Sequence, residues 1–194
     1  MHKGLADLVA PLTYAVASSQ SAYVMRGYKA PSPVERHYRV VATLSLLGLS
    51  KHATCPGVLL GVPVTHWAAV PSLPAKPGEH PFHQIVKGSA PGSEVVLTAA
   101  ANCSNARTIN VSHFTANQGL PENSHVLVLD DTWTSGGHAQ SAALSLRRAG
   151  AKKISTLVAA RWVKRDFGNN AEFLDRLPDY NPDICPWTGD NCPS

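Results

Sequence analysis

The order of apolar and polar positions predicts two helices in the first quarter of the chain. Residues 5–17 predict a helix that is interrupted near Pro11, and residues 33–49 predict a second helix whose apolar side chains have helical spacing. Ser32 is the expected N-cap of the second helix, and Pro33 suits its first turn. The expected apolar face of this helix consists of Val34, Tyr38, Val41, Leu44 and Leu47.

Beyond residue 60 the pattern changes to short apolar runs that are typical of strands. The runs are Trp67–Val70, Glu94–Thr98, His125–Leu129 and Ile154–Ala159. The last two are almost entirely apolar, as strands are when both faces of a parallel sheet are covered. Between them, Ala139–Ala149 predicts an amphipathic helix with Gly150 just past its end. Strand, helix and strand in this order predict a single doubly wound α/β domain with a mainly parallel sheet.

The chain divides into three parts on this interpretation. Residues 1–60 are expected as an N-terminal helical segment, residues 61–165 as the α/β core, and residues 166–194 as an irregular tail that packs on the core. Within the core, Pro71–Pro81 is expected as a loop of defined shape, and residues 101–124 as a polar loop or hairpin.

Composition narrows the class of protein. With 44% hydrophobic and 15% charged residues, the chain has enough apolar side chains for a packed core. The formal charge is +4, and the lysines and arginines are scattered instead of clustered, which disfavours nucleic acid as a partner. No stretch of apolar residues is long enough to span a bilayer and no secretory leader is visible, so we expect no membrane contact and a cytoplasmic protein.

The segment from His125 to His138 carries the candidate chemistry. It combines an apolar strand, the acidic pair Asp130 and Asp131, and a small-residue loop before a helix, and ligands bind at this edge of open α/β sheets. The loop glycines allow positive φ, and the amide groups at the helix start attract an anion. Ionised carboxylates only accept hydrogen bonds, so a sugar diol suits them, and a diol beside a phosphate indicates a ribose 5-phosphate. The expected substrate contacts here are Thr132, Thr134, Ser135, Gly136, Gly137 and His138.

An alternative without a ligand stays open, because an acidic strand end followed by an ordinary glycine-rich turn has the same sequence pattern. Two common nucleotide sites are disfavoured, since the sequence contains neither GxxxxGK[ST] nor GxGxxG. The histidines His80, His83 and His113 match neither HxH nor HExxH, and we expect them at the surface or in loops.

The segment resembles the motif that binds 5-phosphoribosyl-1-pyrophosphate (PRPP) in type I phosphoribosyltransferases. The resemblance implies that Asp130 and Asp131 bind the ribose hydroxyls, and one of these carboxylates would support an oxocarbenium-like sugar during catalysis. It also implies that the loop from Thr134 to His138 binds the 5′-phosphate. His138 stands where the family usually has threonine. Thr134 stands where hypoxanthine-type members have aspartate, which argues against that subgroup.

Two further segments resemble the branch of the family that contains the competence-protein F (ComF)-like and amidophosphoribosyltransferase-like members. Residues 66–83 resemble its pyrophosphate-binding strand and turn, with Ser72 and Lys76 as contacts, and residues 107–114 resemble its mobile basic loop, with Arg107 as a contact. Because PRPP carries three phosphate groups, we expect Lys76, Arg107 and a bound Mg²⁺ to offset the charge of its pyrophosphate.

Three hypotheses for function result. The first is a PRPP-dependent pentosyltransferase, which transfers the 5-phosphoribosyl group to an unidentified acceptor and releases pyrophosphate. The second is a non-catalytic protein that senses PRPP or a nucleotide. The third, argued by analogy alone, is a ComF-like accessory protein in DNA uptake or repair. Small molecules are the expected partners, and a homodimer is an alternative that the sequence does not decide.

The four cysteines form no CxxC pair. Cys185 and Cys192 flank a turn in the tail, and we expect free thiols there. One alternative is a reversible disulfide. Another is a zinc site completed by Cys55 together with Cys103 or His52, although this spacing differs from the usual zinc knuckle.

Overall fold

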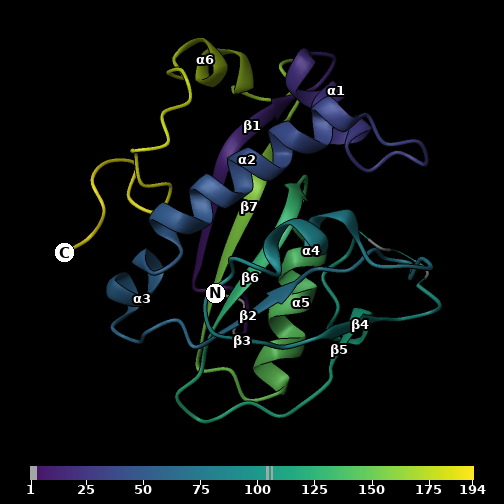
Figure 1. Cartoon of the computed structure of the whole chain (residues 1–194), viewed down its shortest axis with the longest axis vertical. Coiled ribbons are helices and arrows are strands. Elements are labelled where there is room, and N and C mark those ends of the chain that lie inside the picture. Colours follow the sequence, from purple (N-terminus) through teal and green to yellow (C-terminus); the bar gives the residue numbers. More distant parts are fainter. Residues whose placement is uncertain (1–3, 104, 106) are drawn as a thin grey trace.

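The central feature of the protein is a five-stranded sheet, seen in a computed structural model that describes residues 4–103, 105 and 107–194 (Figure 1). The strands lie in the order β1-β7-β6-β2-β3 and all four neighbouring pairs are parallel. Their bounds are Leu8–Val16 (β1), His66–Ala69 (β2), Ser93–Glu94 (β3), His125–Trp133 (β6) and Lys153–Val163 (β7). The α/β class and the mainly parallel sheet expected from the sequence are confirmed.

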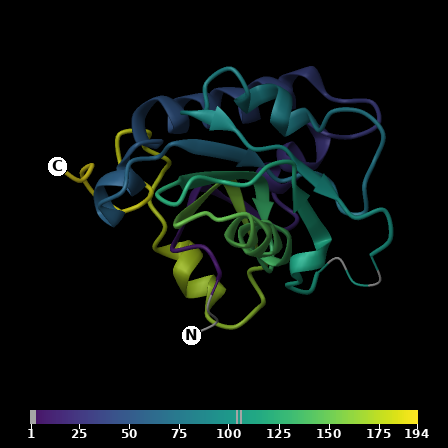
Figure 2. The same ribbon diagram turned by 90° about the horizontal axis from the view of Figure 1, so that it is seen from below.

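Helices cover both faces of the sheet, as a doubly wound domain requires (Figure 2). One face carries α1 (Gln20–Gly27), α2 (Glu35–His52) and α4 (Pro81–Val86), and the other carries α5 (Gly137–Arg148). The remaining elements are α3 (Cys55–Leu60), α6 (Asn170–Asp175), the 3-10 helix η1 (Val111–His113) and an antiparallel pair of strands, β4 (Leu97–Ala99) and β5 (Phe114–Ala116). Within the described ranges, none of the helices is both long and apolar enough to cross a membrane.

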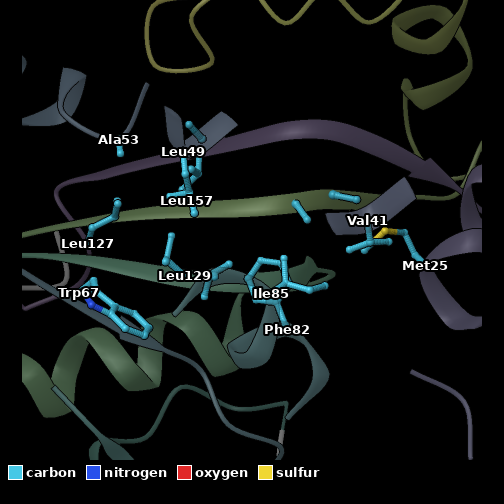
Figure 3. Packing of buried hydrophobic residues seen from close by; sticks show 14 of the residues in the cluster. Met25, Val41, Leu49, Ala53, Trp67, Phe82, Ile85, Leu127, Leu129 and Leu157 are labelled. Carbon is cyan, nitrogen blue, oxygen red and sulfur yellow. The ribbon is translucent and has the colours of Figure 1, made fainter. Parts of the chain in front are cut away.

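Two apolar cores lie on the two faces of the sheet, and β6 contributes to both because its side chains point alternately to one face and the other. Leu127 and Leu129 pack with Trp67 of β2 and with side chains of α2 and α4 (Figure 3). Val126 and Val128 pack on the opposite face against α5. Because successive side chains of a strand point to opposite faces, this alternation fixes the direction of every later residue in β6.

The helix expected over residues 5–17 is wrong, since Leu8–Val16 forms the edge strand β1. It pairs with β7 from Leu8 opposite Ser155 to Val16 opposite Val163. Pro11 is compatible with this position because an edge strand makes ladder bonds on one side only. Helix α2 approaches β1 closely at Gly48, where a Cβ would lie 2.5 Å from the side chain of Leu12.

Further expectations about individual elements need correction. Helix α2 begins after Val34, no side chain caps it, and Ser32 lies outside it. Its buried face is His37, Val41, Ser45, Gly48, Leu49 and His52, whereas Val34 and Leu47 are exposed. The strand expected at Glu94–Thr98 is divided between β3 and β4, which belong to different sheets. The tail, expected to be irregular, contains the short helix α6.

Candidate functional site

The acidic pair lies inside β6, which runs further than its apolar pattern predicts. Asp130 is opposite Val158 of β7, and pairing continues to Trp133 opposite Arg161. Both acidic residues are buried, with 8% of Asp130 and 5% of Asp131 exposed. Strand alternation directs Asp131 to the face that carries α1, α2 and α4, and Asp130 to the face that carries α5.

Asp131 is held by donors from the segment that follows α1. The Tyr28 hydroxyl donates a hydrogen bond to its Oδ2, and the Lys29 ammonium lies 2.5 Å from the same atom. Burial would raise the pKa of Asp131, but the Lys29 charge and these hydrogen bonds outweigh burial and hold the pKa below its usual range. Asp131 is therefore a carboxylate with its charge already compensated.

His80 completes the surroundings of Asp131. It precedes α4, and its Nδ1 accepts a hydrogen bond from the Phe82 amide, so the proton of the neutral ring is on Nε2, 4.0 Å from Asp131 Oδ2. Burial lowers the pKa of His80, Asp131 raises it, and the charges of Lys29 and Lys76 lower it. His80 lies in the loop before α4, as expected, but it is half-buried and also forms part of the charged group around Asp131.

Asp130 has a different environment from its neighbour. Its Oδ1 accepts a hydrogen bond from the Asp131 amide at 2.8 Å. Burial, and then the negative charge of Asp131, raise the pKa of Asp130 to about 7. At neutral pH the Asp130 carboxyl is consequently divided between a protonated form, which donates a hydrogen bond, and an ionised form, which only accepts.

The loop after β6 leads directly into α5. Thr134 and Ser135 are exposed, and Gly136 has a φ of 79° at the position before the helix. A Cβ on Gly136 would lie 2.3 Å from the Trp133 ring, so both its φ and this close contact require glycine. No side chain among the described residues caps α5, and its amide groups together with the helix dipole favour an anion at this end.

Gly137 brings a second segment against this loop. A Cβ on Gly137 would lie 2.4 Å from the carbonyl oxygen of Arg107. The approach is supported one turn further along α5, where Ser141 Oγ accepts from the Asn110 amide at 3.0 Å and donates to the Gly137 carbonyl at 2.6 Å. The exposed Arg107 side chain therefore starts beside the loop, although no sequence spacing relates residue 107 to residue 137.

The other expected contacts lie around the same edge of the sheet. Thr132 is in β6, and His138 is in the first turn of α5 with its ring 6.5 Å from that of Phe114. Ser72 is half-buried and Lys76 is exposed, both in the loop between β2 and α4. Lys76 is close enough to lower the pKa of His80, so its charge acts on the surroundings of Asp131.

The residues that the sequence did not indicate are Tyr28, Lys29 and His80. Tyr28 and Lys29 lie 103 and 102 positions before Asp131, and no motif connects segments that far apart. His113, expected at the surface or in a loop, is buried instead, between Cys103 Sγ at 3.3 Å and Ser141 Oγ at 3.2 Å.

At this edge of the sheet, the described residues alone offer few ligand atoms for a metal ion unless a phosphorylated molecule is also bound. Among the described residues, the set of three or more clustered His, Cys, Asp and Glu side chains lies elsewhere, at His52, Cys55, Cys185 and Cys192. The two carboxylates of β6 point to opposite faces, so a magnesium ion here would depend on phosphate oxygens for its other ligands. Two surface hollows, one lined by residues from Ser18 to Arg26 and one by residues from Asn169 to Pro178, include none of the expected contacts.

Comparison with known proteins adds little to this geometry. No family model matches the sequence, and no curated protein matches it. Among solved structures, the chain is similar to the crystal structure of purine phosphoribosyltransferase from Pyrococcus horikoshii Ot3, with 12% identity and a TM-score of 0.31, over 60% of this chain and 79% of that chain. An overlap of this quality carries no argument, so the fold assignment rests on the sheet itself and membership of the ComF-like branch stays a prediction.

Proposed function

We propose that the chain binds PRPP with Mg²⁺ at the carboxyl edge of its sheet and transfers the 5-phosphoribosyl group to an acceptor, with release of pyrophosphate. One observation carries the proposal: a buried acidic pair and an uncapped, glycine-lined helix start are joined by a short loop at the end of β6. These are the two recognition elements that a phosphorylated pentose needs, an acceptor pair for its diol and an anion site for its phosphate.

The placement of the ligand follows from the charges. The 5′-phosphate binds the loop from Thr134 to His138 at the start of α5, where amide groups and hydroxyls donate. The ribose lies over the end of β6, where one hydroxyl meets Asp130 on the side of α5 and the other meets Asp131 on the opposite side. The pyrophosphate extends toward Ser72, Lys76 and Arg107, and Mg²⁺ bound with it would offset part of its charge. The backbone of Arg107 lies against Gly137, so its side chain starts at the same edge of the sheet as the loop.

The ion pair of Asp131 gives Lys29 a role in the same proposal. A carboxylate that binds ribose hydroxyls gives up one of its present donors, Tyr28 or Lys29. The released Lys29 ammonium is then a cation beside an incoming pyrophosphate. Lys29 thus adds a third cation to Lys76 and Arg107. Those two side chains alone are few for a ligand with three phosphate groups.

The reaction is a displacement at the anomeric carbon. The bond between that carbon and the pyrophosphate oxygen breaks, and a bond to the acceptor forms as the acceptor's proton passes to solvent. The cationic side chains stabilise the leaving group, Mg²⁺ would add to this stabilisation when it is bound, and a carboxylate of the acidic pair stabilises the oxocarbenium-like sugar. No general base is assigned, because an acidic acceptor does not require one.

The binding step is tested by calorimetry with PRPP and Mg²⁺ on the wild type and on Asp131→Asn. The substitution removes the charge that faces the diol, and we expect affinity to fall by about tenfold or more. Asp183→Asn is the matched control, because Asp183 also pairs with a lysine, at 2.7 Å from Lys51, but in the exposed tail. No binding by the wild type, or equal affinities in all three proteins, would contradict the proposal.

A non-catalytic PRPP sensor is a second candidate, favoured by the closed ion pair between Lys29 and Asp131. In a sensor, opening of this pair by the ligand would be the signal and no bond would break. Pyrophosphate release separates the two functions. Release in the presence of bases, amines or aromatic acids supports the transferase, whereas PRPP binding without release across that panel supports the sensor.

A further inference from the structure

A cluster of side chains with metal-binding atoms lies where the C-terminal tail meets the junction of α2 and α3. His52 is the last residue of α2 and Cys55 the first of α3, while Cys185 and Cys192 come from the tail, which passes this end of α2 (Figure 1). The four candidate ligand atoms all lie within 4.8 Å of one another. None of these residues takes part in the proposed PRPP site.

The dimensions of the cluster suit a tetrahedral metal ion. With zinc–sulfur bonds of about 2.3 Å, two thiolates of one tetrahedral site lie about 3.8 Å apart. The 4.8 Å limit within the cluster is therefore larger than a closed site by about 1 Å, which rotation of cysteine side chains covers. Three residues are buried, His52, Cys55 and Cys185, and Cys192 closes the cluster from the solvent side.

His52 is oriented as a metal ligand is. Its Nε2 lies 3.0 Å from the carbonyl oxygen of Pro182, which accepts only, so Nε2 carries the proton and donates. The other ring nitrogen, Nδ1, then presents its lone pair, and it lies 3.3 Å from Cys192 Sγ. A backbone carbonyl that fixes the tautomer of a histidine is the usual outer contact of a metal-bound imidazole.

The turn between the two tail cysteines holds them on one side. The Cys185 amide donates to the Asp190 carbonyl at 2.7 Å, and the Gly189 amide donates back to the Cys185 carbonyl at 2.8 Å. Gly189 has a φ of 76°, which glycine adopts without strain. Trp187 Nε1 donates to the His52 carbonyl at 2.9 Å and so fixes the turn to the end of α2.

A disulfide would explain this arrangement of side chains less completely than a metal ion does. It would use two of the three thiols and leave a third thiol and an oriented imidazole without a role. The fourth cysteine of the chain, Cys103, lies beside His113 and takes no part. Of the two sets that the sequence allows for a metal, the one that includes His52 is therefore the one brought together.

We propose that His52, Cys55, Cys185 and Cys192 bind one zinc ion that anchors the tail to the α2–α3 junction. Three soft thiolates and an imidazole in a closed tetrahedral set are typical of structural zinc. The thiols release their protons to solvent as they bind. Beyond α6 the described tail contains neither helix nor strand, so the metal supplies attachment that secondary structure does not.

The test uses the full chain, freed of any affinity tag and loaded with zinc alone. We expect about one zinc per chain after gel filtration in the wild type and in Cys103→Ser, the matched control outside the cluster. Cys192→Ser removes the most exposed ligand without disturbing the core, and we expect zinc affinity, measured by competition with a chelator, to fall by about tenfold or more. Chelation of the wild type should also speed protease cleavage after Tyr180.

Cobalt distinguishes metal ligands from residues that matter for folding alone. Co²⁺ bound at this site should give the intense visible bands of a tetrahedral complex and a thiolate charge-transfer band. At saturation that band should be lower by about a third in Cys192→Ser, since one of three thiolates is lost. A folded wild type without stoichiometric zinc, a disulfide between Cys185 and Cys192 in place of metal, or identical cobalt spectra in Cys192→Ser and Cys103→Ser would overturn the proposal.

Discussion

Asp130 and Asp131 are adjacent in sequence but have opposite surroundings. Asp131 faces Tyr28 and Lys29 and has a lowered pKa, whereas burial and the charge of Asp131 raise the pKa of Asp130 to about 7. Two carboxyl groups at one site therefore differ in protonation, as they do wherever local environments separate two acids. At a ribose diol, this difference allows Asp130 to donate or accept a hydrogen bond while Asp131 only accepts.

Gly137 gives the sharpest prediction at the residue scale. In Gly137→Ala the new Cβ would lie 2.4 Å from the Arg107 carbonyl, and backbone atoms cannot rotate away as a side chain does. We expect a loss of about 1–3 kcal/mol in the free energy of unfolding. We also expect PRPP affinity to fall by about tenfold, because the Arg107 segment moves off the loop.

Gly88→Ala is the control for this substitution, since a Cβ on Gly88 has no neighbour within 4 Å among the described residues. Urea unfolding and calorimetry on both variants make the comparison. If Gly137→Ala were as stable as Gly88→Ala and bound PRPP as the wild type does, the contact between the two segments would have no importance for the site.

Single residues show which features of the site the sequence can predict and which it cannot. The placement of Asp130, Asp131 and the glycine loop between a strand and a helix could be predicted, because strand, acids and helix follow one another along the chain. Lys29 could not, because its ion pair with Asp131 joins positions 102 apart and depends on how α1 crosses the sheet. His80 was missed for the same reason, since its burial comes from tertiary packing and not from any local motif.

At the scale of elements, apolar patterns identified strands in the centre of the sheet better than at its edge. β6 and β7 are covered on both faces, so their apolar runs were recognised and only their ends differ. β1 is an edge strand that contains Pro11 and mixes Ala and Leu with Val, Thr and Tyr, so its local propensity is ambiguous. Its pairing with β7 decides that it is a strand. The same pairing brings residues of the expected N-terminal segment into the main sheet.

Ser141 tests how α5 holds the segment from Arg107 to His113. Its hydroxyl meets the Asn110 amide, the Gly137 carbonyl and His113 Nδ1. Ser141→Ala leaves these groups without that partner, and we expect a loss of about 1–2 kcal/mol in the free energy of unfolding. Thermal or urea denaturation measures it.

Ser45→Ala is the matched control in another helix. Ser45 is also buried, but its hydroxyl has no hydrogen-bond partner in the part of the chain that the structure describes. Removal of an unpaired buried hydroxyl should leave stability unchanged or increase it. Equal losses in both serine variants would show that the hydrogen bonds of Ser141 contribute nothing beyond packing.

For the whole molecule, the two proposals place two functions at separate points of one α/β domain. The proposed ligand site is at the carboxyl edge of β6, and the proposed anchor of the tail is at the end of α2 (Figure 1). The two respond to different reagents, PRPP with Mg²⁺ at the first and zinc or a chelator at the second. A variant that loses one function while it keeps the other therefore tests one proposal independently of the other.

The stability of the whole domain should depend on pH through Asp130. Its pKa is about 7 in the folded protein against an ordinary value of 3.8, so the native state binds a proton that the unfolded state has lost between these values. Where the native state binds more protons, stability falls as pH rises, by about 1.4 kcal/mol per pH unit at most. This loss begins near pH 4 and ends near pH 7. Asp131, whose pKa is lowered in the folded protein, affects stability only below this pH range.

Asp130→Asn isolates this effect, since the amide oxygen can still accept from the Asp131 amide but has no proton to lose. Urea unfolding at pH 5 and pH 8 should show the variant gaining stability relative to the wild type as pH rises. Burial also lowers the pKa values of His80 and His125, but these histidines are present in both proteins and largely cancel in the difference. A difference that stays constant from pH 4 to pH 8 would mean that Asp130 is ionised in the fold, and its role as a donor to the ribose would be lost.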